Sequence, residues 1–168
     1  LEELINYHDG PISTNSYYAH SKISLKASKD NYKVILSGTG ADEIFTGYYD
    51  HHLFFLSELK NNKDPLFNEN FENWKKYIKP IVRNPFLKDP NKIMCNNNFR
   101  DHIYLNKNKV SKILINDSNQ IFKERKFTKS ALKNRMMNEL FHESVPVILQ
   151  EDDLNSMFNS IENRSPFL

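Results

Sequence analysis

The chain has 168 residues, of which 39% are hydrophobic and 26% charged, and it contains only four glycines and seven prolines. This length and composition predict one globular unit with a core of its own. The formal net charge is only +2. Lysine and arginine are scattered among aspartate and glutamate, so the sequence gives no electrostatic case for binding nucleic acid.

Two further features of the composition bear on the cellular compartment and on membrane association. The single cysteine, Cys95, excludes an intrachain disulfide framework and suits a reducing compartment, so we expect a cytoplasmic protein. The sequence has no run of about eighteen apolar residues and no charged-then-apolar leader. We therefore expect neither a membrane span nor a signal peptide.

The first part of the chain predicts helical segments joined by a turn. Residues 1–7 are compatible with the end of a helix, and Asp9-Gly10-Pro11 predicts a turn because glycine and proline punctuate there. Residues 16–28 predict a second helix. Its expected inward side chains are Tyr17, Ala19, Ile23 and Ala27.

A strand, a turn and a helix are predicted next. Residues 32–36 are mostly apolar and include the β-branched Val34 and Ile35, and the run is short enough for a buried strand. The small residues at 37–41, Ser-Gly-Thr-Gly-Ala, let the backbone turn sharply and approach a ligand closely. Apolar residues then recur at spacings of three, four and seven, which predicts one long helix with a single buried face. They are Ile44, Phe45, Tyr48, Phe55, Leu56 and Leu59.

This strand-turn-helix order is typical of a phosphate pocket. The start of the helix would offer unpaired N–H groups, and its dipole favours an anion by up to ~2 kcal/mol. Asp42 and Glu43 would repel phosphate unless a divalent cation such as Mg²⁺ lay between the oxygens. The residues therefore indicate a nucleotide with Mg²⁺. They are equally compatible with a tight connection whose two acids complement the helix dipole.

Farther along, Asp-Pro and Asn-Pro pairs at residues 64–65, 84–85 and 89–90 predict loops. Between them a helix is expected near residues 71–79, with Trp74 and Tyr77 as candidate core residues. Residues 99–105 and 110–115 could each be helical or extended, because short apolar runs do not decide this.

The longest remaining helix is predicted over residues 128–149. Its apolar stripe consists of Leu132, Met136, Met137, Leu140, Phe141 and Val145. Pro146 lacks an N–H, so it should either kink this helix or mark the junction of two helices.

Two segments resemble motifs of the asparagine synthase family. Residues 37–48, Ser-Gly-Thr-Gly-Ala-Asp-Glu-Ile-Phe-Thr-Gly-Tyr, resemble the second nucleotide-site motif of that family. Residues 152–153 are paired aspartates, and Ser-Ile-Glu-Asn-Arg-Ser-Pro-Phe-Leu at 160–168 is similar to the family segment that follows such a pair. Residues 9–18 also resemble the segment before the strand, so the resemblance spans nearly all of the chain.

The resemblance implies a fold and a reaction. The chain would be a helix-rich α/β fragment of a parallel-sheet, adenine nucleotide alpha hydrolase-like domain, with residues 1–168 forming part of a single synthetase domain. ATP and Mg²⁺ would activate a carboxylic acid, such as aspartate, as an acyl-adenylate. Ammonia released from glutamine by a separate N-terminal glutaminase domain would then attack it.

The resemblance also assigns roles to residues. The ATP-binding turn would consist of Ser37, Gly38, Thr39 and Gly40, with Ser37 and Gly38 contacting ATP. Asp42 matches a ligand of the magnesium-pyrophosphate group. The family's far segment makes Asp152, Asp153 and Arg164 candidate catalytic residues, and a bend before residue 151 would return the acids towards the turn.

Some features depart from the family pattern. Many asparagine-forming members carry glutamate at the position of Thr39, and glycine is common at the position of Thr46. Because of Thr39, the alternative remains that the enzyme is a relative that amidates a sugar-derived or other carboxylate.

The chain also lacks an N-terminal nucleophilic cysteine and the family's first pyrophosphate loop. We therefore expect an excerpt of a longer enzyme that is inactive alone, and a non-catalytic remnant remains the second alternative.

Overall fold

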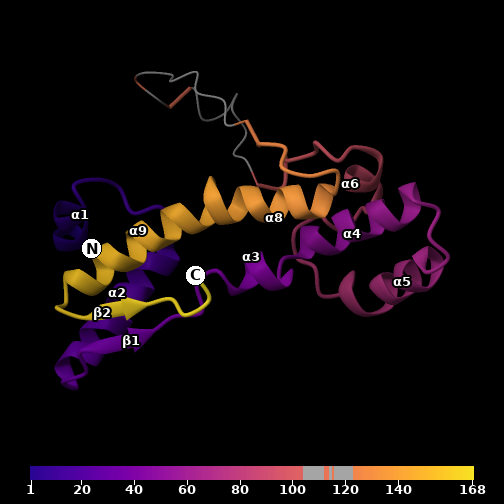
Figure 1. Ribbon diagram of the computed structural model, residues 1–168. Helices are drawn as coiled ribbons and strands as arrows, with labels where there is room; N and C mark the ends of the chain where they lie inside the picture. The colour runs from indigo at the N-terminus through magenta and orange to yellow at the C-terminus, as the bar shows by residue number, and fades with distance from the viewer. Residues whose placement is uncertain (104–111, 114, 116–122) are drawn as a thin grey trace. The chain divides into compact units, whose positions relative to one another are not determined.

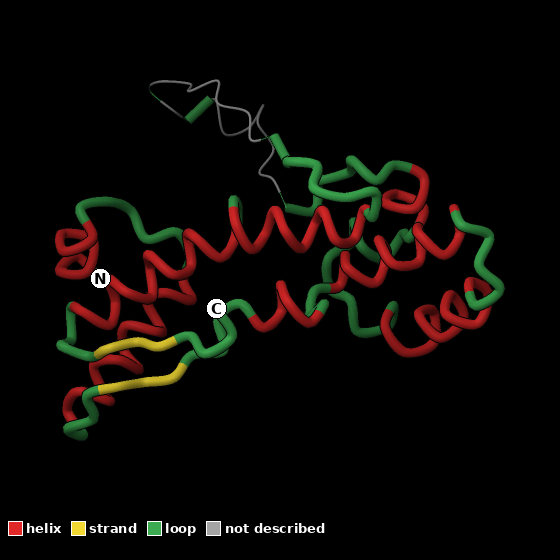
Figure 2. The backbone as a smooth tube through the Cα atoms, in the orientation of Figure 1, coloured by secondary structure: helices red, strands yellow, loops and turns green. Residues whose placement is uncertain are grey.

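The computed structural model describes residues 1–103, 112–113, 115 and 123–168 (Figure 1). In this part of the chain, helices dominate and two short strands form a parallel sheet, giving a helix-rich α/β protein (Figure 2). The chain divides into two compact units. Unit 1 contains Leu1–Phe45 and Asn138–Leu168, and unit 2 contains Thr46–Met137. No described helix is both long and apolar enough to cross a membrane.

Unit 1 contains the predicted first helices and the strand. Its elements are α1 (Glu2–His8), α2 (Asn15–Lys29), β1 (Val34–Leu36), α3 (Ala41–Phe45), α9 (Ser144–Met157) and β2 (Glu162–Arg164). The helices predicted at 1–7 and 16–28 and the strand predicted at 32–36 are confirmed, with small shifts of their ends.

The sheet joins two distant parts of the sequence. β1 pairs with β2 in parallel, with Val34 opposite Glu162 and Leu36 opposite Arg164. The prediction that β1 is buried is wrong, because Val34 is 39% and Leu36 74% exposed. Within the described residues the sheet has only two strands, which leaves most of the apolar surface of β1 uncovered.

The seam between α2 and α9 is polar. Tyr17, Ser21 and Ser24 are the buried residues of α2, whereas Ala19 is exposed and Ile23 is 61% exposed, so the prediction that these two face inward is wrong. Small serines allow close packing, and their hydroxyls can be satisfied by backbone carbonyls.

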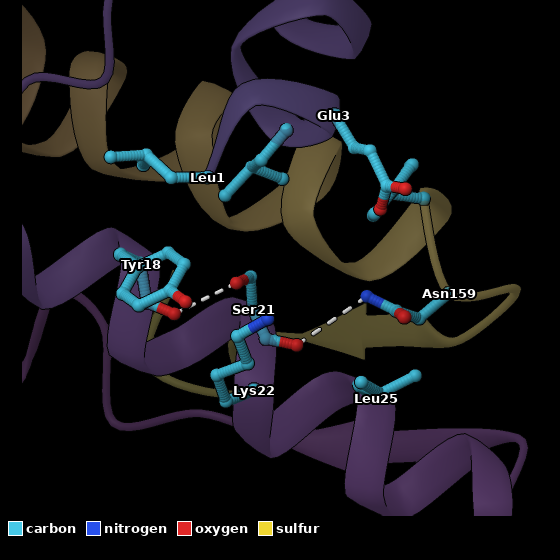
Figure 3. A pocket seen from close by; sticks show the side chains of 9 residues that line it. Leu1, Glu3, Tyr18, Ser21, Lys22, Leu25 and Asn159 are labelled. Carbon is cyan, nitrogen blue, oxygen red and sulfur yellow. Dashed lines mark hydrogen bonds between the residues drawn. The ribbon is translucent and has the colours of Figure 1, made fainter.

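One hydrogen bond within α2 satisfies the Ser21 hydroxyl, and two others join α2 to residues 155 and 159. The Ser21 hydroxyl donates to the Tyr18 carbonyl at 2.7 Å, and the Asn159 amide donates to the Ser21 carbonyl at 3.5 Å (Figure 3). The Asn155 amide donates to the Tyr17 carbonyl at 3.1 Å. A pocket of about 250 Å³ adjoins the seam, and none of the sequence-predicted site residues lines it.

The long helix predicted after the turn is interrupted, which corrects that prediction. α3 ends at Phe45, and α4 (Tyr49–Asn61) begins four residues later. Thr46 has a φ of 60° and Tyr48 is extended, so the chain leaves helical geometry between them. The apolar residues keep a helical spacing on both sides of this break, so the sequence pattern did not indicate it.

The interruption also changes which side chains are buried. Leu56 and Leu59 lie inside as predicted, but Phe45 and Phe55 are exposed. The buried face of α4 instead includes Leu53 and Phe54.

Unit 2 has an apolar core. Unit 2 contains α4, α5 (Phe67–Asn73), the π-helix η1 (Trp74–Ile78) and α6 (Asn91–Cys95). The predicted proline loops lie between these helices. The buried core cluster consists of Leu53, Phe54, Leu56, Trp74, Val82, Leu87, Ile93 and Met94. Trp74 is 3% exposed as expected, but Tyr77 is 58% exposed, so its prediction as a core residue is wrong. The wider π-turn carries Tyr77 away from the face of Trp74.

The last two helices meet earlier than Pro146. α8 (Ala131–Phe141) and α9 are separate, and Glu143 lies at their junction with a non-helical backbone. Pro146 is in the first turn of α9, where its missing N–H costs no hydrogen bond. Residues 99–103 are neither helix nor strand, and the rest of the undecided segments lies partly outside the described residues.

The apolar stripe predicted for residues 132–145 is confirmed in part: Val145 is buried, Leu132 packs against the core, and Met136, Met137 and Leu140 are half-buried. Phe141 is 54% exposed, so its place in the stripe is wrong, and the fully buried side chains of α8 are polar: Arg135, Asn138 and Glu139. Hydrogen bonds and ion pairs, which hydrophobic periodicity does not reveal, decide which face is inward.

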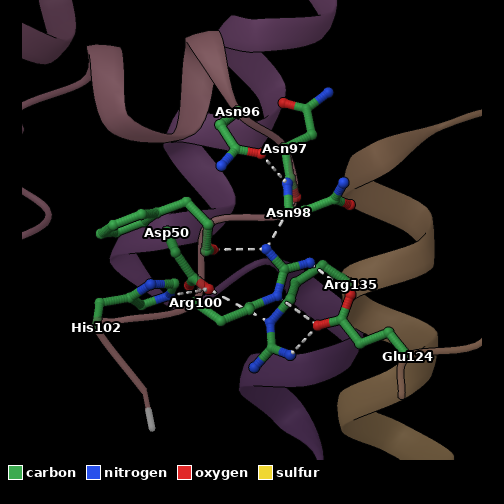
Figure 4. Close-up of polar contacts among 9 residues, drawn as sticks. Asp50, Asn96, Asn97, Asn98, Arg100, His102, Glu124 and Arg135 are labelled. Carbon is green, nitrogen blue, oxygen red and sulfur yellow. Dashed lines mark hydrogen bonds and ion pairs between the residues drawn. The ribbon is translucent and has the colours of Figure 1, made fainter. Parts of the chain in front are cut away.

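A partly buried ion network lies in unit 2 (Figure 4). Arg100 donates two hydrogen bonds to the Glu124 carboxylate, and Arg135 donates a third at 3.0 Å. Arg135 also pairs with Asp50 at 3.4 Å, and the His102 Nε2 atom lies 3.1 Å from the same Asp50 oxygen. The network thus holds α4, α8 and the loop after α6 together.

Both acids of the network have a lowered pKa. Burial alone would raise the pKa of Asp50, but the hydrogen bond with His102 and the nearby charges of His51 and Arg135 hold it below its ordinary value. Burial would also raise the pKa of Glu124, but the hydrogen bonds and charges of Arg100 and Arg135 lower it. The ionised carboxylates therefore stabilise the folded unit.

We predict that Thr46→Gly stabilises the protein. A left-handed conformation costs an L-residue roughly 1–2 kcal/mol, and the added backbone entropy of glycine offsets only part of this gain. Thermal unfolding followed by circular dichroism should show a higher midpoint. Thr14→Gly is the control, because Thr14 has a φ of −146° and no strain to relieve. A midpoint for Thr46→Gly at or below that of the control would contradict the strain argument.

We predict that acid destabilises unit 2 through Asp50 and Glu124. Their pKa values are lower in the folded state, so their stabilisation is present above the ordinary carboxyl pKa of about 4 and is lost as the pH falls through the folded values. Asp50→Asn should cost about 3 kcal/mol at neutral pH and flatten the acid dependence.

The fluorescence of Trp74, the single tryptophan of the chain, reports unfolding of unit 2. Asp30→Asn is the matched control, because the Lys26 to Asp30 ion pair is exposed and should contribute little. An acid dependence of Asp50→Asn as steep as that of the unchanged protein would refute this assignment.

Candidate functional site

The turn after β1 presents unpaired backbone donors. Ser37 N–H donates to the carbonyl of the last residue of β2 at 2.9 Å, and Ala41 N–H donates to the Gly38 carbonyl at 3.1 Å. The N–H groups between them, those of Gly38, Thr39 and Gly40, have no acceptor among the residues that the structure describes. Three successive unpaired donors in a turn form an arrangement that can accept an anion.

The two glycines of the turn lie in different surroundings. A Cβ atom at Gly38 would meet nothing within 4 Å, so a ligand can approach the backbone there. Gly40 has a φ of 89°, and a Cβ atom at this position would lie 2.5 Å from the Leu168 side chain. Gly40 is therefore required by conformation and packing, whereas Gly38 leaves the turn open.

A chain of hydrogen bonds leads from the turn to α9. The Thr39 hydroxyl donates to Asp152 Oδ2 at 2.9 Å, and the Ser37 hydroxyl donates to Thr39 at 3.1 Å. Ser165 lies 3.0 Å from Ser37 and must be the donor, because the single hydroxyl hydrogen of Ser37 is already used. The three hydroxyl groups therefore donate in one direction, towards the Asp152 carboxylate.

The other oxygen of Asp152 faces α2. Oδ1 lies 3.3 Å from His20 Nδ1, and the Asp152 side chain is 9% exposed whereas that of His20 is 50% exposed. The preceding acid has a similar arrangement. Glu151 accepts a hydrogen bond from Ser13 at 2.6 Å and lies 3.3 Å from His8. Two neighbouring acids of α9 are thus each held beside a histidine.

These acids affect the nearest phenol. Burial raises the pKa of Tyr17, and the negative charges of Asp152 and Glu151 raise it further. Tyr17 therefore remains protonated near neutral pH and cannot serve as a base there.

Asp153 is placed differently from Asp152. Its side chain is exposed, and it lines a pocket of about 280 Å³ together with Leu149, Asn163 and Ser165. Ser165 belongs both to this pocket and to the hydrogen-bond chain from the turn. The pocket thus adjoins the turn and offers one carboxylate for a substrate group.

The remaining predicted residues lie at the edge of this arrangement. Asp42 is exposed near the start of α3 and has no hydrogen-bond or ion-pair partner among the described residues. Arg164 is also exposed, and its guanidinium pairs with Glu162 at 2.7 Å, which lowers the pKa of Glu162. The structure therefore brings Ser37, Thr39 and Asp152 together but leaves the Arg164 side chain turned to Glu162.

Sequence reasoning missed His20, Ser165 and the pairing of Glu151 with His8. Ser165 stood inside a motif without an assigned role. His20 follows Tyr17 by one helical turn, a spacing that puts the two side chains on one face. Nothing in the sequence indicated which acid would lie beside this face.

Comparisons with known proteins identify the family of the chain. The family model described as asparagine synthase matches residues 1–168. No curated protein and no solved structure gave a match. Since the match covers the whole chain, the protein belongs to the asparagine synthase family, whose members are in general ATP-dependent amidating ligases.

Proposed function

We propose that this chain supplies part of the ATP site of an amide-forming ligase that activates a carboxylate as an acyl-adenylate. The observation that carries the proposal is the turn after β1, with unpaired N–H groups at Gly38, Thr39 and Gly40. Such donors suit the phosphate oxygens of a nucleotide, and preorganised donors can stabilise the charge of departing pyrophosphate.

The residues beside the turn fit a magnesium ion. Asp42 offers an exposed carboxylate without a protein partner among the described residues, and Mg²⁺ prefers oxygen ligands of this kind shared with phosphates. When bound, the ion would neutralise charge on the phosphate groups. In this proposal Ser37 and Gly38 contact ATP, and Asp42 is the metal ligand.

The acid to be amidated would lie between the turn and α9. Asp153 and the pocket beside Ser165 are placed to contact it, whereas Asp152 orients groups of the site. Arg164 could contribute only after leaving Glu162. Ammonia would come from a glutaminase domain of the same enzyme, and the exposed, unpaired Cys95 is compatible with a cytoplasmic location.

Thr39 favours a second candidate substrate class. Its hydroxyl is bound to Asp152 and carries no charge that could hold the ammonium group of an amino acid. A sugar-derived acid such as glucuronate is therefore the alternative to aspartate. A non-catalytic remnant is the other alternative, and it would need no magnesium-dependent nucleotide binding.

We predict that the full-length protein binds ATP in a magnesium-dependent way and that Asp42→Asn weakens this binding about tenfold or more. Losing the carboxylate removes a charged metal ligand but leaves the backbone donors in place. Calorimetric titration with ATP, with and without Mg²⁺, measures the change. Asp30→Asn serves as the control because Asp30 lies at the other end of β1, in an exposed ion pair. Unchanged magnesium-dependent binding by Asp42→Asn would remove this residue from the metal site.

A second prediction compares the two glycines. Gly38→Ala should leave the unfolding temperature nearly unchanged but weaken ATP binding, because its Cβ atom would occupy open space that the ligand needs. Gly40→Ala should lower the unfolding temperature, since the new Cβ atom meets Leu168 and the backbone has a positive φ. Thermal unfolding and nucleotide titration of both variants give the two readouts. ATP binding by Gly38→Ala that equals that of the unchanged protein would argue against contact at this residue.

A further inference from the structure

The hydrogen-bond chain of the turn ends at an imidazole that faces solvent. It runs from Ser165 through Ser37 and Thr39 to Asp152, and the second oxygen of Asp152 lies 3.3 Å from His20 Nδ1. Asp152 is nearly buried, whereas half of the His20 side chain is accessible. A buried carboxylate therefore connects the proposed nucleotide turn to an accessible titratable ring.

The Asp152 carboxylate determines which nitrogen of His20 can act. A carboxylate oxygen only accepts hydrogen bonds, so the proton of a neutral His20 ring must reside on Nδ1. Nε2 is then left with a free lone pair. This is the arrangement in which an acid orients a histidine that works as a base.

We infer that His20 accepts the proton released when the amine attacks the activated carboxylate, and that Asp152 is its positioning residue. The inference rests on the proposed function. The nitrogen lone pair of ammonia forms the new C–N bond at the acyl carbon, and the bond from that carbon to the phosphate oxygen breaks, so that AMP leaves. The nitrogen loses one proton to His20 Nε2, which releases it to solvent.

The neighbouring groups do not compete for this role. The raised pKa of Tyr17 keeps its phenol protonated. Both oxygens of Asp152 are already engaged, by Thr39 and by His20. Glu151 is turned to Ser13 and His8. Asp153 is exposed and lines the pocket beside Ser165, where the proposed function already places it against the acid.

The experiment separates the two half-reactions of the full-length enzyme. ATP–pyrophosphate exchange with aspartate or glucuronate measures adenylation, and amide formation from the same acid with ammonium chloride measures the amine step. His20→Gln should leave exchange within about twofold of the unchanged enzyme and slow amide formation roughly 100-fold, as expected for the loss of a general base. Asp152→Asn should also slow the amine step.

Two further variants make the result specific. Free imidazole should restore part of the amide formation in His20→Ala, because the site of the ring is accessible. His52→Gln, on α4 in unit 2, should leave both half-reactions unchanged. If His20→Gln slows exchange and amide formation equally and imidazole restores neither, His20 is structural and the inference is wrong, although the ligase function stands. If the unchanged enzyme shows no exchange with either acid, the proposed function and the inference fail together.

Discussion

The parallel pairing of β1 with β2 is the constraint on which the candidate site depends. Antiparallel strands can be joined by a short turn, but parallel strands need a crossover, and here the connection includes the whole of unit 2. The register that places Leu36 opposite Arg164 brings the hydroxyl oxygens of the next residues, Ser37 and Ser165, to 3.0 Å from each other. A slip in this register would separate the hydroxyl groups and break the chain that continues to Asp152.

The two units achieve their stability in different ways. Unit 2 has an apolar core around Phe54 and Trp74, with an ion network at its edge. The interior of unit 1 is largely polar and includes Ser21, Asp152 and Asn155. A polar interior is stable only while its groups are satisfied, since an unpaired buried group costs about 1–3 kcal/mol. The residues of the candidate site therefore support the fold as well as the proposed chemistry.

The sequence predicted the strand, the turn and most helices, because these depend on local patterns of apolar and small residues. It also led to the acids of α9 through motif resemblance. It did not predict the break at Thr46, because this depends on a backbone angle rather than on periodicity. The exposure of Ile23 and the role of His20 depend on which helix packs against α2, and a single sequence does not contain that information.

Thr39 shows why positions 39 and 152 must be considered together. A threonine hydroxyl can accept a hydrogen bond from Ser37 and donate one to Asp152 at the same time, so it continues the row of hydrogen bonds in one direction. A carboxylate at position 39 would only accept, and it would face the Asp152 carboxylate at hydrogen-bond distance, where like charges repel strongly in a partly buried site. The hydroxyl at 39, the buried acid at 152 and the accessible imidazole at 20 are therefore mutually dependent. Thr39 therefore keeps the hydrogen-bond chain continuous from Ser165 to Asp152, which a glutamate at this position would interrupt.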